Sequence, residues 1–317
     1  MQQVIMMVGC PASTKGTYVE SLGGGFVVLN RDRVGGKVEK LVPQMVDALK
    51  KGDSVVLDNT FPTVASRKPF IDAACLRHVP IHCKVMETSL EDAQVNALNR
   101  MWDRYGRIFF TPQEIKLHSE ACKDSNIFAP VALFHYRKEY KAPTQAEGFA
   151  SKPEKIPFVR RPALGQHKAL ILDYDDTLRK TKSGAKYPVK PEDIEILPGR
   201  FEKLKKYLDD DWLLLGASNQ SGVSKGDMTE DEAAAMFRHT NKLLGIDIPF
   251  MFCPHSPVPK PGNGCYCRKP QSGILVYFIR KYELDPAQCI YVGDRTTDAT
   301  FAKRLGMPYQ HPDQFFS

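Results

Sequence analysis

The stretch LILDYDDT, residues 170–177, places two carboxylates, one residue apart, at the end of an apolar run. The run is typical of a buried strand in a parallel sheet, and the strand should end where the acids begin. Ligands of open α/β sheets bind beyond the carboxyl ends of the strands, so Asp173 and Asp175 should project into a site. One can attack as a nucleophile while the other donates a proton to a leaving group. Viewed alone, the stretch could equally be a strand that ends in an acidic turn.

Three more clusters of polar side chains follow in the second half of the chain. They are, in order, Ser218 and Asn219 after the apolar run 213–217, then Arg268 and Lys269, then Asp294 and Asp298 after the apolar run 289–292. A hydroxyl and an amide at a strand end can hold phosphate oxygens by hydrogen bonds. The series of two Asp, a Ser, a Lys and two more Asp is much more specific than any one of its members.

A short segment between Asn219 and Arg268 contains several soft metal ligands. It contains Cys253, His255, Cys265 and Cys267. Three thiols and an imidazole make a Cys₃His set, which suits structural Zn²⁺. The alternative is a group of unligated thiols, but four soft ligands in one segment favour the metal. Because Lys269 follows Cys267 by two residues, a metal here would also position the loop that carries Lys269.

The first half of the chain begins with an apolar run, a loop and a predicted helix, in the layout of a P-loop. Gly9 and Lys15 match the first Gly and the Lys of the pattern G-x-x-x-x-G-K-[ST]. Thr14 replaces the second Gly, and Gly16 stands where the hydroxyl that binds magnesium belongs. Thr17 is the next hydroxyl, but one position on a helix turns a side chain by about 100°. From this loop alone, a nucleotide site and an ordinary turn between strand and helix are both open.

Two further patterns in the first half carry charged side chains. Asp32 follows the apolar run 26–30, where it could act as a general base for a hydroxyl nucleophile or pair with a neighbouring Arg on the surface. Arg100 and Arg104 share one face of a helix predicted over 90–105, because residues four apart are neighbours there. They suit a lid that neutralises charge in phosphoryl transfer, although such residues commonly form a solvated helix face.

Length and composition favour a protein of two globular domains. The chain has 317 residues, of which 42% are hydrophobic and 26% charged, and a formal net charge of +7. The Pro-rich segment 142–166 has little periodicity, so we expect a linker there, between domains at 1–141 and 167–317. The positive charge suits a polyanionic partner without requiring one. The scattered Cys residues suggest reduced thiols and an intracellular protein, cytoplasmic or nuclear, and no run is long and apolar enough to span a membrane.

The first 140 residues or so resemble the kinase domain of the polynucleotide kinase-phosphatase family, in the order with the kinase first. The residues that carry the resemblance are Gly9-Cys10-Pro11, Lys15, Asn30-Arg31-Asp32, Asp58-Asn59-Thr60, Arg100 and Arg104. The resemblance implies transfer of the ATP γ-phosphoryl group to a 5′-hydroxyl end, with Asp32 as the base and Arg104 stabilising the transition state. It also implies that Gly9, Lys15 and Thr17 bind ATP and that Arg100 binds the substrate.

The second half resembles the haloacid dehalogenase phosphatases. In that family the first Asp attacks phosphorus, so the resemblance implies that Asp173 is the nucleophile and that Asp175 is the general acid. The two Asp residues would also bind Mg²⁺, Asp175 through its backbone carbonyl. The other implied roles are phosphate binding by Ser218 and Lys269, substrate binding by Asn219 and Arg268, completion of the Mg²⁺ site by Asp294, and orientation of Lys269 or water-mediated metal binding by Asp298. Similar zinc loops occur in the histidinol-phosphate and heptose-bisphosphate branch of this superfamily.

The sequence thus predicts an α/β protein with two parallel-sheet domains, a P-loop kinase-like domain and a Rossmann-like haloacid dehalogenase phosphatase domain. We expect a bifunctional enzyme that removes 3′-phosphates and phosphorylates 5′-hydroxyls at DNA or RNA ends, with Mg²⁺, structural Zn²⁺ and ATP. Nucleic-acid ends and a ligase acting downstream are the expected partners, and no membrane is expected. Two alternatives stay open: a 3′-phosphatase whose altered P-loop domain only binds nucleic acid, and a small-molecule phosphatase of the sugar-bisphosphate type.

Overall fold

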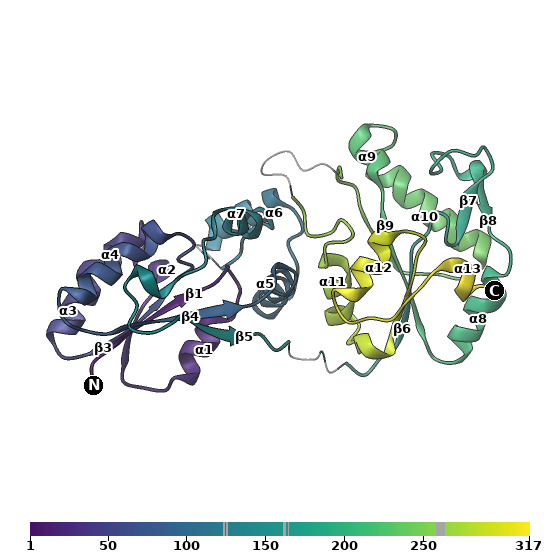
Figure 1. Cartoon of the computed structure of the whole chain (residues 1–317). Helices are drawn as coiled ribbons and strands as arrows, with labels where there is room; N and C mark the ends of the chain where they lie inside the picture. Colours follow the sequence, from purple (N-terminus) through teal and green to yellow (C-terminus); the bar gives the residue numbers. More distant parts are fainter. Residues whose placement is uncertain (123, 125, 161–162, 164, 258–263) are drawn as a thin grey trace. The chain divides into compact units, whose positions relative to one another are not determined.

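The computed structural model describes the chain except residues 123, 125, 161–162, 164 and 258–263. The described residues form two compact units. Unit 1 contains Met1–Ala97 and Ser119–Arg160, and unit 2 contains Leu98–His118 and Arg161–Ser317. Each unit has its own parallel sheet with helices packed beside it (Figure 1), which confirms the predicted fold class. None of the helices in the described ranges combines the length and the apolar character that a membrane crossing needs.

The sheet of unit 1 has five parallel strands in the order β2-β3-β1-β4-β5. The strands are β1 (Val4–Val8), β2 (Phe26–Leu29), β3 (Ser54–Asp58), β4 (Ile81–Glu87) and β5 (Glu154–Pro157). The central strand β1 is buried along its whole length, which explains its continuous apolar sequence. Its alternate residues face opposite sides of the sheet, so Met6 joins one core cluster and Met7 another.

Helices connect the strands of unit 1 and cover the sheet (Figure 1). The helices of the first half are α1 (Lys15–Ser21), α2 (Arg31–Val34), α3 (Leu41–Lys50), α4 (Val64–Cys75), α5 (Leu90–Tyr105), α6 (Pro112–Cys122) and α7 (Val131–Glu139). Met45 of α3 and Phe70 of α4 are fully buried against the side of the sheet that Met6 faces. Val19 of α1 packs with Met7 on the other side.

The segment expected to be a linker, residues 142–166, forms part of unit 1 as far as Arg160. Strand β5 pairs with β4 at the edge of the sheet, with Ile156 beside Met86. It has four residues and one half-buried side chain, so its sequence shows no alternation that would mark a strand. The segment is also held by a buried ion pair, in which Nε and Nη2 of Arg67 lie 2.7 and 2.9 Å from the carboxylate oxygens of Glu147.

Unit 2 is built on a second parallel sheet with the order β10-β9-β6-β11-β12. Its strands are β6 (Ala169–Leu172), β9 (Leu213–Asn219), β10 (Phe250–Cys253), β11 (Ile290–Val292) and β12 (Tyr309–Gln310). The predicted first strand of the phosphatase motif, β6, is therefore central. Ile171 points into one core cluster and Leu172 into the cluster on the opposite side, so both faces of β6 are covered.

A short hairpin and six α-helices that follow β6 in the described part of the chain also belong to unit 2. The hairpin is formed by β7 (Arg179–Thr181) and β8 (Ile194–Ile196), which pair in antiparallel fashion. The helices are α8 (Arg200–Asp209), α9 (Ser221–Lys225), α10 (Glu230–Leu244), α11 (Gly273–Lys281), α12 (Thr296–Lys303) and α13 (Pro312–Phe315). The hairpin was not predicted, because strands of three residues are too short to show alternation.

Residues 98–118, which the sequence placed in the first domain, belong to unit 2. Trp102 packs edge-on against Tyr277 of α11, with ring centroids 5.8 Å apart. The carbonyl of Phe110 accepts a hydrogen bond of 2.8 Å from the backbone N–H of Tyr266. The end of α5 and the start of α6 are therefore packed in the unit of the second sheet. An amphipathic helix pattern predicts that a face is buried, but it does not tell which core the face joins.

Candidate phosphatase, metal and P-loop sites

Polar side chains from several elements of unit 2 meet at the carboxyl edge of its sheet. Asp173 follows β6, Ser218 lies near the end of β9, and Asp294 follows β11. These three strands are neighbours and run parallel, so their ends lie at one edge. Lys269 comes from the loop before α11 and Asp298 from α12. Separated parts of the sequence thus form a single cluster of charges.

Lys269 is the cation at the centre of this cluster. Its buried Nζ lies 3.1 Å from Oδ2 of Asp173 and 2.7 Å from Oδ1 of Asp298. It also donates to the carbonyl of Ala217 and to the hydroxyl of Tyr291, each at 2.9 Å. Burial alone would lower the pKa of Lys269, but the two carboxylates outweigh it and the pKa lies above its usual value. Lys269 is therefore a fixed positive charge beside Asp173 at neutral pH.

Asp173 is buried and oriented by its surroundings. Burial raises the pKa of Asp173 to about 6, although the neighbouring Lys269 favours the ionised form. Its Oδ1 accepts a hydrogen bond of 2.9 Å from the backbone N–H of Tyr174, and its Oδ2 faces Lys269. A carboxylate that is ionised at neutral pH, held in one orientation and shielded from water has the properties of a nucleophile.

Three carboxylates of the cluster are suited to share a divalent cation. Oxygens of Asp173, Asp294 and Asp298 all lie within 4.8 Å of one another. Oδ1 of Asp294 is buried and has no hydrogen-bond partner among the described residues. A buried carboxylate oxygen without a donor is unfavourable unless a cation binds it. Hard oxygen ligands in this arrangement fit Mg²⁺.

Asp175 is not one of these three carboxylates, and its side chain has partners of its own. Its Oδ1 accepts from Nε of Arg179 and its Oδ2 from Nε2 of Gln220, each at 2.8 Å. Gln220 also lies 3.2 Å from Oγ of Ser218, so it links the predicted acid to the predicted phosphate-binding hydroxyl. The next residue, Asp176, has φ of 58°, a left-handed conformation that Gly adopts more readily than any other residue.

Asn219 and Arg268, both predicted to bind substrate, make structural hydrogen bonds. The side chain of Asn219 accepts from the backbone N–H of Lys269 at 2.9 Å and donates to its carbonyl at 3.1 Å. Nη1 of Arg268 donates to the carbonyl of His255 at 2.8 Å. Asn219 thus holds the loop that presents Lys269, and Arg268 ties that loop to the Cys and His cluster.

The reasoning from sequence missed three buried side chains of the site: Arg179, Gln220 and Tyr291. The hydroxyl of Tyr291 accepts from Lys269 and lies 3.0 Å from Oδ1 of Asp298. A Tyr within a short buried strand needs a partner for its hydroxyl, and this was a signal in the sequence. Arg179 and Gln220 gave no such signal, because their hydrogen bonds to Asp175 are visible only in the fold.

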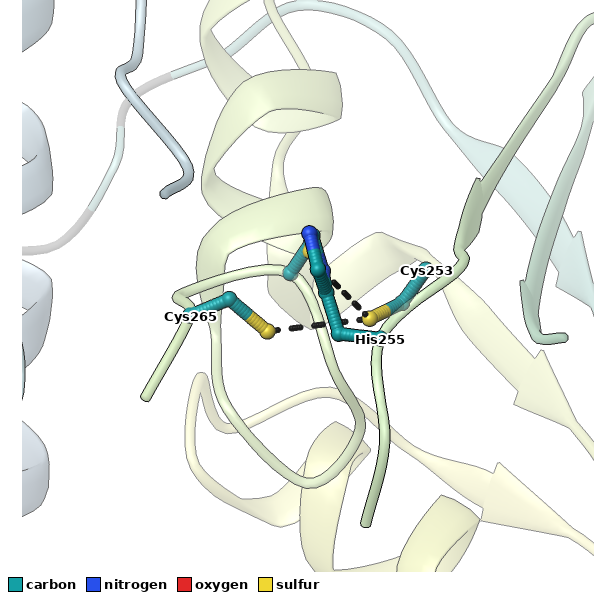
Figure 2. Close-up of side chains that lie close together, drawn as sticks. Cys253, His255 and Cys265 are labelled. Carbon is teal, nitrogen blue, oxygen red and sulfur yellow. Dashed lines mark hydrogen bonds between the residues drawn. The ribbon is translucent and has the colours of Figure 1, made fainter. Parts of the chain in front are cut away.

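Cys253, His255, Cys265 and Cys267 come together as the sequence predicts. Figure 2 shows the first three of these side chains. The sulfurs of Cys253 and Cys265 are 3.6 Å apart, and Nδ1 of His255 lies 3.3 Å from the sulfurs of Cys253 and Cys267. A tetrahedral zinc ion with ordinary bond lengths separates two sulfurs by about 3.8 Å and a sulfur from a nitrogen by about 3.6 Å. The cluster therefore has nearly the dimensions of a zinc site.

The pKa values of the side chains in this Cys and His cluster are shifted in opposite directions. Hydrogen bonds from Cys253 and Cys267 lower the pKa of Cys265, whereas hydrogen bonds with Cys253 and Cys265 raise the pKa of Cys267. Hydrogen bonds to Cys253 and Cys265 raise the pKa of His255 to about 10. Sulfurs this close cannot all be thiolates without a cation, and a bound metal ion would supply the missing positive charge.

The loop after β1 in unit 1 has the compact form of a P-loop. A side chain at Gly9 would approach Oγ of Ser13 to 2.6 Å, so only Gly fits there. Nζ of Lys15 donates to the carbonyls of Gly9 and Cys10 at 3.0 and 2.9 Å, which folds its side chain over the loop. Thr14 has φ of 64°, the left-handed conformation for which the usual Gly is suited.

Gly16 faces the end of β3. A Cβ atom built at Gly16 would lie 3.9 Å from Oδ2 of Asp58, an ordinary contact. Asp58 also accepts a hydrogen bond of 3.1 Å from the side chain of Asn30. There is thus room for the hydroxyl that the P-loop pattern has at position 16, next to a carboxylate. Thr17, the expected replacement, is exposed.

The predicted kinase residues are not all in one unit. Asp32 follows β2 in unit 1 and pairs with Arg31 at 3.3 Å on the surface. This surface ion pair is the alternative to a general base that the sequence left open. The backbone N–H of Asp32 is capped by the side chain of Asn30 at 2.7 Å. Arg100 and Arg104 lie on the part of α5 that belongs to unit 2, Arg100 half-buried and Arg104 exposed.

Comparisons with known proteins match the two halves of the chain to two different families. Residues 168–316 match the family model described as Polynucleotide kinase 3 phosphatase, and residues 4–116 match a model described as AAA domain.

Individual proteins resemble parts of the chain. A Thermoplasma volcanium protein named "Probable D-glycero-D-manno-heptose-1,7-bisphosphate 7-phosphatase" is 34% identical over 45% of this chain and 97% of its own length. The Bifunctional polynucleotide phosphatase/kinase of Schizosaccharomyces pombe is 30% identical over 56% of this chain and 36% of its own length. The crystal structure of D,D-heptose 1,7-bisphosphate phosphatase from B. bronchiseptica, complexed with magnesium and phosphate, is 28% identical with a TM-score of 0.40, covering 45% of this chain and 78% of that one.

The fold, the site and these matches define a two-domain protein of the phosphoryl-transfer class, an AAA-like P-loop domain followed by a haloacid dehalogenase-like phosphatase domain. Its phosphatase domain makes it a phosphoric monoester hydrolase. The chain belongs to the polynucleotide kinase-phosphatase family, in the order with the kinase first.

Proposed function

We propose that the protein heals nucleic-acid ends, removing 3′-phosphates in unit 2 and phosphorylating 5′-hydroxyls with ATP in unit 1. The observation that carries the proposal is the cluster of Asp173, Lys269, Asp294 and Asp298 within a domain that matches polynucleotide 3-phosphatases. The matching P-loop domain ahead of it supports the second activity. We expect DNA or RNA ends as substrates, a ligase to use the healed ends, and an intracellular location, cytoplasmic or nuclear.

In the first step, a carboxylate oxygen of Asp173 attacks phosphorus, and the bond from phosphorus to the 3′-oxygen breaks. The proton of Asp175 goes to the leaving oxygen, which departs as the 3′-hydroxyl. Ser218 and Lys269 hold the phosphoryl oxygens during the transfer. Lys269 suits this role because its ammonium already lies 3.1 Å from Asp173.

In the second step, water attacks the phosphorus of phospho-Asp173. Asp175 takes a proton from this water, the bond from phosphorus to the Asp173 oxygen breaks, and inorganic phosphate leaves. Both side chains then return to their starting protonation states. Asp298 keeps Lys269 in place throughout, since its carboxylate is 2.7 Å from Nζ.

Two metals fit the residues of unit 2. Asp173 and Asp294, with the carbonyl of Asp175, would hold Mg²⁺, and Asp298 would contact it through water or act on Lys269 alone. Mg²⁺ would supply positive charge that offsets the repulsion between the carboxylates and the phosphate. The Cys253, His255, Cys265 and Cys267 cluster would hold structural Zn²⁺.

In unit 1, Gly9, Lys15 and Thr17 would bind the phosphates of ATP, and Asp32 would accept the proton of the 5′-hydroxyl. The position of Asp32 after β2 supports this role, and it would have to leave Arg31 to perform it. For Arg104 and Arg100, which belong to unit 2, the resemblance to the family still implies charge neutralisation in the transition state and substrate binding.

A second candidate function is hydrolysis of a small sugar bisphosphate. The relative that favours it is the Thermoplasma volcanium protein, which this chain spans almost completely and matches at 34% identity. That reading leaves the P-loop domain without a role.

The experiment that separates the candidates measures three rates with the same purified protein and Mg²⁺. They are phosphate release from a 3′-phosphorylated oligonucleotide, phosphate release from heptose 1,7-bisphosphate, and transfer from γ-labelled ATP to a 5′-hydroxyl oligonucleotide. We expect the oligonucleotide to exceed the sugar by at least about a hundredfold in kcat/KM, with detectable transfer. A preference for the sugar would refute the proposal. Absence of transfer alone would remove the kinase part and leave unit 1 as a nucleic-acid clamp.

A further inference from the structure

We infer that Arg179 and Gln220 are positioning residues for the general acid Asp175, because together they hold both oxygens of its carboxylate. Nε of Arg179 donates to Oδ1 at 2.8 Å, and Nε2 of Gln220 donates to Oδ2 at 2.8 Å. The inference rests on the proposed hydrolysis through Asp173 and Asp175. It adds two side chains to which that mechanism assigned no role.

Arg179 is built into unit 2 in a way that leaves its guanidinium little freedom. Its side chain is 1% exposed, and Nη1 donates to the carbonyl of Met236 at 2.9 Å and to Oγ1 of Thr240 at 2.7 Å. The guanidinium carbon also lies 4.9 Å from the centre of the Phe237 ring. Since α10 carries all three of these partners, the position of Nε is fixed by the packing of a helix rather than by solvent. A buried guanidinium also requires a countercharge, and Asp175 provides it in its ionised form, the form that acts as the base in the second step.

Gln220 holds the second oxygen from the other side. Its side chain is 3% exposed, and its backbone N–H donates to the carbonyl of Cys253 at 2.8 Å. Its Nε2 reaches both Oδ2 of Asp175 and Oγ of Ser218. Gln220 therefore fixes the distance between the general acid and the hydroxyl that would hold the phosphoryl group.

Arg179 and Gln220 differ in whether the Asp175 oxygen that they bind can carry a proton. A guanidinium donates hydrogen bonds and never accepts one, so Oδ1 of Asp175 stays an acceptor. The transferred proton must then be carried by Oδ2. The amide of Gln220 suits both forms of this oxygen, because after a half-turn its carbonyl accepts from a carboxylic acid. In the first step Oδ2 gives its proton to the leaving oxygen, and in the second step it takes one from water.

The test is a rapid-mixing assay of Arg179→Met with p-nitrophenyl phosphate and Mg²⁺. The p-nitrophenolate group leaves readily without a proton, so the first step should stay within about threefold of wild type. The second step still needs Asp175 as a base, so steady-state turnover should fall by at least about tenfold. The expected signature is a burst of one p-nitrophenolate per active site. With a 3′-phosphorylated oligonucleotide, whose leaving group needs the proton, the first turnover should fall by about a hundredfold.

Two further variants keep the test decisive. Gln220→Leu removes the hydrogen bond to Oδ2 without leaving a buried charge, and we expect it to give the same burst. It replaces Arg179→Met in the test if that variant does not fold. Thr240→Val is the matched control, since it removes one hydrogen bond from the guanidinium and keeps those to Met236 and Asp175. We expect no burst with Thr240→Val.

The inference would be overturned if Arg179→Met and Gln220→Leu slowed the first turnover and the steady state equally, with both substrates. Both residues would then only support the fold. Failure of the proposed function would look different: Asp173→Asn would keep wild-type turnover, whatever the two variants did.

Discussion

At the scale of single residues, the phosphatase site is defined by an imbalance of charge. Asp173 and Asp298 contact the ammonium of Lys269, and the neighbouring Asp294 has Nε of Arg295 3.6 Å from its Oδ2, so three close carboxylates have two cations beside them. Two like charges about 4 Å apart repel by about 4 kcal/mol near a protein surface. Protonation of one carboxyl or binding of Mg²⁺ would relieve this repulsion. Burial is the main cause of the raised pKa of Asp173, and the nearby carboxylates of Asp298 and Asp175 add to it.

The first prediction concerns the nucleophile. Asp173→Asn keeps the shape of the side chain but removes the attacking oxygen, so kcat should fall by on the order of a thousandfold or more. Phosphate release from p-nitrophenyl phosphate and from a 3′-phosphorylated oligonucleotide checks it, with circular dichroism to confirm folding. Asp176→Asn, at the exposed neighbouring carboxylate, serves as the control and should keep most activity. Substantial turnover by Asp173→Asn would dismiss this residue as the nucleophile.

The second prediction concerns stability and pH. The pKa of Asp173 is raised from 3.8 to about 6, so the folded protein binds a proton more tightly than the unfolded chain does. Its contribution to stability is therefore complete below about pH 4 and is lost as pH rises to about 6. In magnesium-free buffer, urea unfolding across this range should show wild type losing stability relative to Asp173→Asn. A gain relative to that variant with rising pH would contradict the prediction.

The sequence predicts the members of the site that follow strands, and misses those defined by a partner in space. Asp173, Ser218 and Asp294 stand at strand ends, where the parallel sheet brings them to one edge. Arg179 begins a hairpin strand too short to predict, and it becomes significant only because its side chain reaches Asp175. No spacing rule in the sequence connects Gln220 with the same carboxylate.

At the scale of elements, the loop between β10 and α11 combines a metal site with a catalytic residue. Cys253 ends β10, and Cys267 precedes Lys269 by two residues. Arg268 reaches back to the carbonyl of His255, and Asn219 of β9 grips the backbone of Lys269. A metal in the cluster would therefore stiffen the loop that holds Lys269 beside Asp173.

The third prediction is that zinc is bound here and supports this loop. Cys265→Ser should lower the zinc content from one ion per chain and reduce the free energy of unfolding by about 3 kcal/mol or more. Phosphatase activity should fall with it, because Lys269 loses its support. Elemental analysis and thermal unfolding check these effects, with Cys75→Ser at an exposed thiol as the control. Wild-type protein without zinc, purified with no chelator, would contradict the prediction.

The fourth prediction concerns the loop between β1 and α1. Gly16→Ser would place a hydroxyl beside Asp58 without a clash, where the P-loop pattern has its magnesium ligand. We expect Mg²⁺-dependent ATP binding to tighten and 5′-phosphorylation to rise by at least about tenfold. Calorimetry and transfer from γ-labelled ATP measure the two effects. Gly24→Ser is the matched control, because nothing lies within 4 Å of a side chain there. Equal ATP binding and 5′-phosphorylation by the two variants would show that a hydroxyl at position 16 does not improve the kinase site.

At the scale of the whole molecule, the order of the domains is visible in the sequence but their boundary is not. The P-loop and the phosphatase motifs are local patterns, and the family matches follow the same order. The unit to which residues 98–118 and 142–160 belong is decided by contacts with residues that are distant in the sequence. The helix α5 enters both units, and β5 adds an edge strand to the first sheet. Such contacts leave no periodic trace in a single sequence.

The fifth prediction tests whether residues 98–118 support the second unit. Trp102→Ala removes a ring that packs on Tyr277 of α11 and should lower the stability of unit 2 by about 1–2 kcal/mol. Thermal unfolding followed by zinc release to a coloured chelator measures this unit in the full chain. Phe134→Ala, at a 38% exposed side chain of α7 in unit 1, is the control and should leave zinc release unchanged. Equal release from both variants would mean that the segment does not support unit 2.

The most direct test of the central claim is to trap the covalent intermediate from a nucleic-acid end. An oligonucleotide labelled at its 3′-phosphate is mixed with the protein and Mg²⁺, quenched in acid at successive times, and the labelled peptide is mapped by mass spectrometry. We predict a phosphoryl group on Asp173 that is absent from Asp173→Asn. Label on another residue, or phosphate release by Asp173→Asn at the wild-type rate, would contradict the proposed chemistry.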